Sequence, residues 1–330
     1  MNTRQVMTFA LKVIMSGGLL VFVFSLAPLT SVIEVISSAD LGLVVSGSAT
    51  FLLLHYISAW KLYYLSAPQK ITVSVLKLFS INLASHFYGS VLPLGAVVSS
   101  VVRWHKISSI DGQRAQAFAV AVLNRIIEFL VVAGIGLGAW ALDSHPGRPA
   151  AFGGIIALIF GICLFAYGLS QSTRLLAWVN RLVERLGHKI PFIAARINKI
   201  TTALSCYPHL TLLQHSRLLA ISIVRNLAGV LALYLLCQSI DIEVSPFTIA
   251  WVRAATTIVV FLPLSMLGLG VREASFLYLL HPFGVQEASA VALGLLYLAA
   301  NLGIAGIGGL IEAHVLFTHR RSPRKRSISR

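Results

Sequence analysis

The sequence predicts an all-α, polytopic integral membrane protein with about six full spans and two re-entrant or broken helical hairpins in an inverted repeat. Of its 330 residues, 57% are hydrophobic and 11% are charged, whereas soluble domains have about 45–50% and 25%. Basic and acidic residues fall in different connections between apolar runs, and two apolar stretches are interrupted by the same Leu-Pro-Leu sequence. These three observations exclude an ordinary soluble domain.

Six apolar runs are long enough to cross a membrane, since about 20 apolar residues span the hydrocarbon core. They are residues 9–29, 41–60, 115–142, 150–169, 218–240 and 287–314. The first is expected to be an uncleaved span. In the last, Asn301, Gly303, Gly306, Gly308 and Gly309 indicate a helix that packs closely against its neighbours.

The charges between the runs predict the orientation. The connections with Glu34 and Asp40, with Asp143, and with Asp241 and Glu243 are expected outside, because cytoplasmic loops are enriched in Lys and Arg. Trp60, Lys61, Tyr63 and Tyr64 resemble an interfacial belt near the basic residues Lys70 and Lys77. We therefore expect a multi-pass protein of the cell (inner or plasma) membrane with both termini in the cytoplasm.

The chain is expected to comprise one membrane domain, residues 1–316, and a basic, disordered cytoplasmic tail, residues 317–330. Residues 170–216 form the one extended polar connection, which has six basic residues between Arg174 and Lys199 against Glu184 alone. Apolar residues from Leu175 to Leu186 recur at helical spacing, which predicts an amphipathic helix on the inner leaflet that Pro191 ends. A plain surface helix fits the same pattern.

Two segments are expected to enter the membrane and return to the same side. Residues 71–102 are too few for two spans with a turn, yet a single crossing would place Arg103, Lys106 and Arg114 outside. Both ends of residues 247–282 are expected outside, because one span remains before the basic tail. Residues 71–102 are expected to enter from the cytoplasm and turn near Pro93 and Gly95; residues 247–282 are expected to enter from outside as a hairpin or two short helices. Each carries Leu-Pro-Leu followed by Val-Arg, with the arginine ten residues after Pro93 and nine after Pro263. Paired interrupted segments of this kind indicate a binding site at a repeat interface.

The candidate site residues are the polar groups in these apolar segments, because intramembrane charges are rare and usually functional. As substrate-binding residues the sequence suggests Arg103, Arg125, Glu128, Arg253, Arg272, Glu273 and Asn82, with Glu128 and Glu273 as counter-charges or proton carriers. The backbone breaks are expected at Gly89, Pro93, Gly95, Pro263, Gly268 and Gly270. An Arg125–Glu128 pair that only fixes packing, and an Arg225 that only extends to the headgroups, remain alternatives.

Other site chemistries find no support in the sequence. Cys163, Cys206 and Cys237 are scattered, so neither a disulfide framework nor a metal site is expected. No nucleotide-binding motif is present, and no catalytic residue or cofactor is expected. The net charge of +15 lies in loops and tail, so nucleic acid is not an expected partner.

The set Gly89-Ser-Val-Leu-Pro-Leu-Gly95 with Arg103, Asn124-Arg125 with Glu128, and Gly268-Leu-Gly-Val-Arg-Glu273 resembles the lysylphosphatidylglycerol synthase transmembrane-region family, also called flippase-like domain proteins. The resemblance covers residues 41–309, and it implies a lipid-translocating module for an aminoacylated phospholipid or a polyprenyl-linked glycan. The chain departs from the family at Ser99 and Ser100, where an acidic residue often precedes the arginine. It has no room for the soluble aminoacyl-transfer domain, so synthase activity is not expected.

The leading hypothesis is therefore a non-enzymatic flippase for an anionic membrane lipid, working beside a lipid-modifying or glycosyl-transfer enzyme. One alternative is a membrane glycosyltransferase with a polyprenyl-phosphate donor, which would need external acidic residues such as Asp40, Asp241 and Glu243. Another is a non-catalytic assembly subunit, for which Arg125 and Arg272 would be dispensable.

Overall fold

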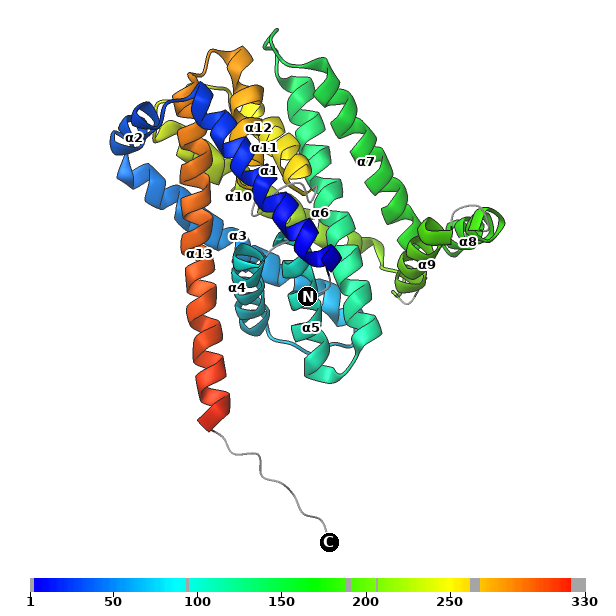
Figure 1. The fold of residues 1–330 in the computed structure, drawn as a ribbon. Coiled ribbons are helices and arrows are strands. Elements are labelled where there is room, and N and C mark those ends of the chain that lie inside the picture. Colours follow the sequence, from blue (N-terminus) through cyan, green and yellow to red (C-terminus); the bar gives the residue numbers. More distant parts are fainter. Residues whose placement is uncertain (1–2, 93–94, 188–190, 206, 262–267, 322–330) are drawn as a thin grey trace.

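The computed structural model describes residues 3–92, 95–187, 191–205, 207–261 and 268–321. Its elements are α1 (Thr3–Leu26), α2 (Leu29–Ser37), α3 (Leu41–Ser66), η1 (Ala67–Gln69), α4 (Val75–Val91), α5 (Gly95–Asp111), α6 (Arg114–Leu142), α7 (Ala150–Gln171), α8 (Thr173–Gly187), α9 (Pro191–Ser205), α10 (Leu212–Gln238), α11 (Pro246–Phe261), α12 (Val271–Leu280), η2 (His281–Phe283) and α13 (Glu287–Arg321). The described residues contain no strand, which confirms the all-α prediction (Figure 1).

The expected spans are present. Five helical segments are long and apolar enough to cross a membrane: α3 with η1, α6, α7, α10 and α13. A sixth candidate is the pair α1–α2, whose axes are bent by 80°. The residues after the first span, expected as a loop, are helix α2 instead. Pro28 precedes this helix with φ −55°, and a residue without an N–H is well placed at a helix start.

The first interrupted segment is a helical hairpin. Helices α4 and α5 pack against each other, and the Thr72 backbone N–H donates to the Asp111 carboxylate at 3.2 Å, so the two ends of the hairpin meet. The second arm continues beyond residue 102, the expected limit, to Asp111. In this extension, Lys106 forms an ion pair with Glu312 of α13 at 2.7 Å. The turn at Pro93 lies outside the described residues.

The second interrupted segment is two short helices, α11 and α12, as expected. The start of α11 is fixed at the α6–α7 connection, where Asp143 accepts hydrogen bonds of 2.8 Å from Thr248 and Trp251. Burial alone would raise the pKa of the Asp143 carboxyl, but these donors lower it below its usual value. The ring of His145 lies 4.4 Å from that of Phe283, just after α12. Pro263 lies outside the described residues.

The two hairpins enter the molecule from opposite ends. Trp104 of α5 donates to the carbonyl of Arg114 at the first residue of α6, whereas the second hairpin is held at Asp143, just after the last residue of α6. A helix of 29 residues is about 43 Å long, so these anchor points are far apart. Figure 1 shows α4 and α5 in the lower half of the molecule and α11 and α12 in the upper half.

Glycines set the packing of the last span on the first hairpin. Helix α13 packs against α4, and a Cβ on Gly308 would overlap the carbonyl of Leu83. A Cβ on Gly309 would overlap the ring of Phe87. Gly303 and Gly306 were also expected to give close packing, but a Cβ on either would meet nothing within 4 Å. Gly308 and Gly309 therefore lie on the face of α13 that contacts α4, whereas Gly303 and Gly306 do not.

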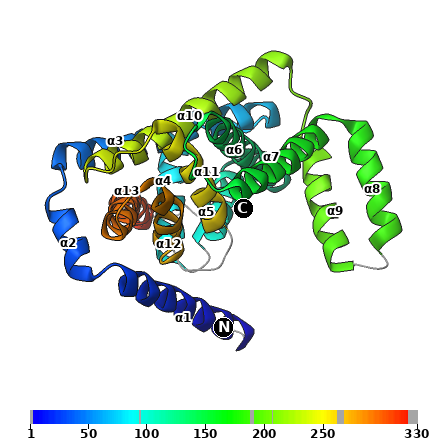
Figure 2. The same cartoon turned by 90° about the horizontal axis from the view of Figure 1, so that it is seen from above.

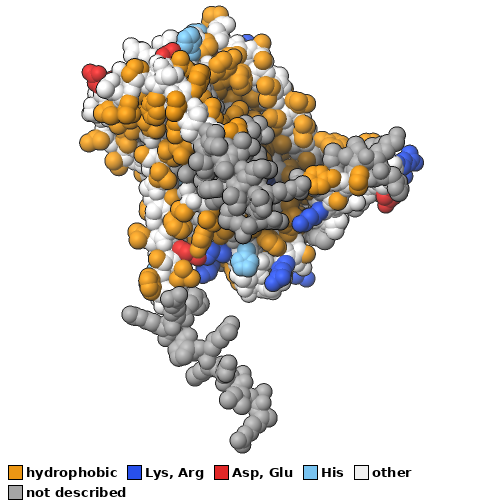
Figure 3. Space-filling model, in the orientation of Figure 1, with side chains coloured by type: hydrophobic (Ala, Val, Ile, Leu, Met, Phe, Trp, Pro, Cys, Tyr) orange, Lys and Arg blue, Asp and Glu red, His pale blue; other side chains and the backbone are white. Residues whose placement is uncertain are grey.

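Helices α8 and α9 pack against each other and project as an arm from the bundle (Figures 1 and 2). Leu176, Val179 and Val183 are buried inside the arm, while Trp178 is 53% exposed. Pro191 does not simply end the amphipathic helix, since it begins α9. On the face in Figure 3, most Lys and Arg side chains lie on this arm and at the lower end of the molecule, and the spans are largely apolar.

We predict that Gly308→Ala lowers the thermal unfolding midpoint of the purified protein, because the added Cβ forces α13 away from α4 at a cost of about 1–3 kcal/mol. Gly306→Ala in the same helix is the matched control. It should leave the midpoint unchanged or raise it, because alanine favours helix over glycine by about 1 kcal/mol. Equal midpoints for the two variants would contradict this packing.

Candidate functional site

A cavity of about 330 Å³ lies where the two hairpins meet. Gly89, Gly95 and Gly268, which flank the two breaks, all line it. Its other walls come from α3, α6, α10, α11 and α13. A smaller cavity of about 180 Å³ adjoins it and shares Arg125, Glu128, Arg253 and Arg272 in its wall. The residues that flank the breaks thus border a polar space. This is expected, because backbone groups without helical hydrogen bonds are not tolerated in apolar surroundings.

The larger cavity is strongly basic. Its lining includes the cations Lys61, Arg103, Arg125, Arg225, Arg253 and Arg272. Glu128 is the only carboxylate among the described residues that line it, and His55 and His86 add two imidazoles. With neutral histidines and a protonated Lys61, the lining carries six positive charges and one negative charge, a net charge of +5.

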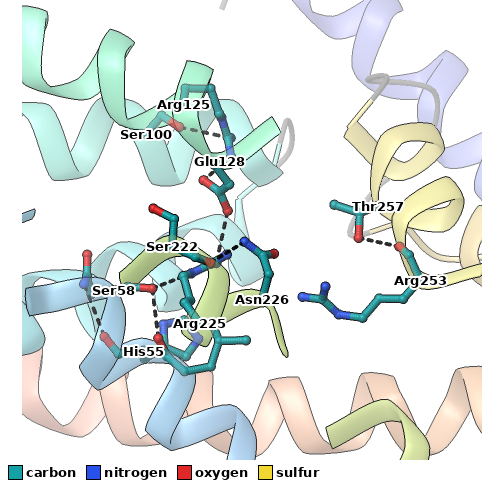
Figure 4. A network of polar contacts seen from close by, with 12 residues as sticks. His55, Ser58, Ser100, Arg125, Glu128, Ser222, Arg225, Asn226, Arg253 and Thr257 are labelled. Atoms are coloured by element: carbon teal, nitrogen blue, oxygen red, sulfur yellow. Dashed lines mark hydrogen bonds and ion pairs between the residues drawn. The ribbon is translucent and has the colours of Figure 1, made fainter. Parts of the chain in front are cut away.

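Glu128 is at the centre of an ion-pair network (Figure 4). Its Oε2 lies 3.3 Å from Nη1 of Arg125 on the same helix, and its Oε1 lies 3.0 Å from Nη2 of Arg225 on α10. Arg225 also donates through Nε to Ser58 of α3 at 2.7 Å, and Arg125 donates to Ser100 of α5 at 3.2 Å. One carboxylate therefore joins four helices.

Three further cations have no carboxylate partner within the described part of the chain: Lys61, Arg103 and Arg253. Lys61 is 1% exposed and Arg253 is 9% exposed, and the Nε atoms of Arg103 and Arg253 are buried without a hydrogen-bond partner. A buried unpaired charge costs several kcal/mol. The cavity therefore holds cations that water or an anion has to solvate.

The position of Arg253 depends on a glycine. A Cβ on Gly229 of α10 would overlap the guanidinium of Arg253, so a larger residue there would displace the charge. In Figure 4 the Arg253 side chain extends from α11 towards the side of Asn226. The sequence of α10 thus makes room for a cation that α11 supplies.

Aromatic rings complete the site. The guanidinium carbon of Arg272 lies 4.7 Å from the ring centre of Tyr297, and that of Arg125 lies 4.7 Å from the ring centre of Phe261. The smaller cavity is otherwise lined mainly by Phe129, Val132, Leu233, Val260, Phe261 and Phe276. We call the larger cavity the basic chamber and the smaller one the apolar chamber, after the rest of its lining. The two chambers share Arg125, Arg253 and Arg272. This arrangement suits a molecule with an anionic head and an apolar tail.

Comparison with known proteins identifies the family. The model of the family described as the lysylphosphatidylglycerol synthase TM region matches residues 9–309. The chain belongs to this family. No match was found among curated proteins or among solved structures. Membership in the lysylphosphatidylglycerol synthase TM family fits a role connected with membrane lipids.

In this family member, the structure brings together five of the residues that the sequence suggested. Arg103, Arg125, Glu128, Arg253 and Arg272 come from α5, α6, α11 and α12, and all line the larger cavity. The spacing of Arg125 and Glu128 indeed produces an ion pair. Arg103 and Arg272, which follow the two Leu-Pro-Leu sequences, line this one cavity from different interrupted segments.

The other two suggested residues lie outside the cavity lining. Glu273 is fully buried and accepts a hydrogen bond of 2.7 Å from the backbone N–H of Gly270, so it caps α12. Asn82 is also fully buried, and its Nδ2 lies 3.4 Å from the carbonyl of His55. Gly270 has φ +76° and packs on α1 at Leu19, so it faces away from the cavity. Asn82, Gly270 and Glu273 therefore pack near the cavity without lining it.

Sequence reasoning missed part of the site. Lys61 was expected in an interfacial belt, but it is buried and lines the cavity. Arg225, for which extension to the headgroups was an equal alternative, is paired with Glu128 instead. A signal was present in α3, where His55, Ser58 and Lys61 recur every three residues on one face of an otherwise apolar helix.

We predict that Glu128→Gln destabilises the protein by up to about 3 kcal/mol, because it removes the counter-charge of two arginines. The double variant Glu128→Gln/Arg225→Gln should recover part of this loss, with a coupling energy of about 0.5–3 kcal/mol. Both are measured as thermal or denaturant unfolding of the purified protein. Strictly additive effects would show that the pair does not stabilise the fold.

Proposed function

We propose that the protein is a flippase for an anionic membrane lipid. The proposal rests on two adjoining chambers, one basic and one apolar. They lie between two hairpins that enter the molecule from opposite ends. A headgroup phosphate would exchange water for the guanidinium groups of the basic chamber. The apolar chamber would hold the part of the chain next to the headgroup, and the remaining chain would stay in the lipid.

The architecture supports transport by alternating access. Binding sites in many transporters lie near the bilayer midplane between inverted repeats, and discontinuous helices form them. Here Arg103 and Arg272 come from opposite hairpins, so movement of either hairpin changes the coordination of a bound headgroup. The first hairpin is tied to α13 by the Lys106–Glu312 pair, with the Tyr88 hydroxyl also donating to Glu312 at 3.3 Å. Opening towards that end would require this contact to break.

The glycosyltransferase alternative finds less support. The carboxylate of Asp40 accepts hydrogen bonds from the backbone N–H groups of Gly42 and Leu43, at 2.7 and 3.1 Å, and so caps α3. In the part of the cavity lining that the structure describes, the one carboxylate is Glu128, which two arginines already neutralise. Acid–base chemistry on a sugar would need a carboxylate free to exchange protons.

We further propose that the protein is a multi-pass protein of the inner or plasma membrane, with the α8–α9 arm in the cytoplasm. In a version with all cysteines replaced by serine, single cysteines at Ser37 and Ser144 should react with an impermeant thiol reagent added outside intact cells. Cysteines at Lys70 and Ser172 should react only after the cells are opened. External labelling at Ser172 would overturn this orientation.

Arg272→Ala should slow lipid translocation in proteoliposomes by about tenfold or more, the effect of losing one charge-assisted hydrogen bond of about 1.5–3 kcal/mol. Arg272→Lys should restore activity only in part, because an ammonium group lacks the planar, bidentate geometry of guanidinium. Arg174→Ala on the exposed face of α8 is the matched control for lost charge. Wild-type translocation by a well-folded Arg272→Ala would refute this site.

A further inference from the structure

We propose that the cavity selects lipids whose headgroup ends in a phosphate with two negative charges, such as a phosphomonoester or a diphosphate. Phosphodiester headgroups with one charge, and headgroups that carry an ammonium group, would bind more weakly. The inference rests on the proposed function, because it specifies the lipid at the same site. It follows from the charge balance of the cavity and from the number of cations that lack a partner.

The charge balance favours a multiply charged anion. The lining carries six cations against Glu128, and that carboxylate is already shared between Arg125 and Arg225. A headgroup with one negative charge would leave four of the five excess positive charges uncompensated, and a headgroup with two would leave three. Each additional negative charge on the ligand reduces the repulsion among the arginines in a space of low dielectric constant, where such repulsion is strong.

The unpaired cations surround the site from different elements. Lys61 is on α3, Arg103 on α5 and Arg253 on α11, and all three line one cavity. A terminal phosphate offers three oxygens that can accept hydrogen bonds on separate sides. A phosphodiester offers only two unesterified oxygens. Cations that approach from three helices therefore match a terminal phosphate better.

The cavity gives no matching site to an aminoacylated, cationic headgroup. An ammonium group would need a carboxylate, and in the described lining Glu128 already neutralises two arginines. Lys61 and Arg103 would repel it directly. The small volume of the chamber, about 330 Å³, is near the lower limit of the roughly 300–1,000 Å³ typical of ligand sites, so the ammonium group would lie close to these cations.

The test compares lipids with identical acyl chains and different headgroups. Each lipid would be added in increasing amounts to the full-length protein in phosphatidylcholine nanodiscs, and bound lipid would be quantified by native mass spectrometry. The measurement is made at about pH 8, where a phosphomonoester carries close to two negative charges. We expect phosphatidic acid to bind at least about tenfold more tightly than phosphatidylglycerol, and lysylphosphatidylglycerol to bind more weakly than both. Soluble pyrophosphate should compete with phosphatidic acid only weakly, because it lacks the apolar part.

Variants assign the preference to the cavity. Arg253→Gln and Lys61→Met should reduce the ratio of the two affinities towards one, while Arg174→Gln, which removes an exposed charge from α8, should not change it. Gly229→Ala keeps every charge but displaces the Arg253 guanidinium. It should reduce the ratio as well, unlike Gly138→Ala in α6, where an added Cβ meets nothing within 4 Å. This second pair tests the inference even if the charge variants fail to fold.

Equal binding of phosphatidic acid and phosphatidylglycerol would overturn the inference, as would a preference that survives all three cavity variants. Pyrophosphate that binds as tightly as phosphatidic acid would refute a lipid ligand. Translocation assays separate this inference from the proposed function. Equal translocation of both phospholipids would refute the selectivity and leave lipid transport in place, whereas selective binding without translocation would refute transport and leave the selectivity standing.

Discussion

The contact of Glu128 with Arg125 and Arg225 is the interaction on which the centre of the structure depends. The Arg225 and Glu128 side chains are 14% and 18% exposed, and that of Arg125 is 30% exposed. Arginines in apolar helices repel one another unless a counter-charge holds them, because charge interactions in a medium of low dielectric constant are strong. By pairing with α10 and with its own helix, Glu128 allows the other cations to be concentrated around one cavity.

The hairpins place that cavity in the middle of the molecule. The first hairpin is held at the start of α6, where Trp104 donates to the carbonyl of Arg114. The second is held just after the end of α6, where Thr248 and Trp251 of α11 donate to Asp143. Gly89, Gly95 and Gly268, which flank the two breaks, therefore line one cavity between these ends. Backbone that is not helical needs other partners in a membrane, and a polar cavity can supply them. The same break that disrupts the helices thus creates the space for a ligand.

The packing of α13 gives the first hairpin a fixed support. Gly308 brings α13 against the backbone of α4, and Glu312 one turn later accepts both Lys106 and Tyr88. A close apolar contact and a charged contact are therefore adjacent on one helix. Together these contacts fix both helices of the first hairpin on α13, since Gly308 and Tyr88 involve α4 and Lys106 lies on α5.

The sequence by itself determined the apolar spans, both interrupted segments and the arginines at 103, 125, 253 and 272, because length, hydropathy and intramembrane charge are local properties. It misplaced Lys61 and left Arg225 undecided, since the environment of a long basic side chain depends on which helix packs beside it. Glu273 was suggested for the cavity on its position next to Arg272, yet neighbours on a helix point in different directions, and the carboxylate caps α12 instead. Only the tertiary structure decided which cations share Glu128 and which remain unpaired, because that depends on the packing of α3, α5, α10 and α11 around α6, contacts between residues far apart in the chain.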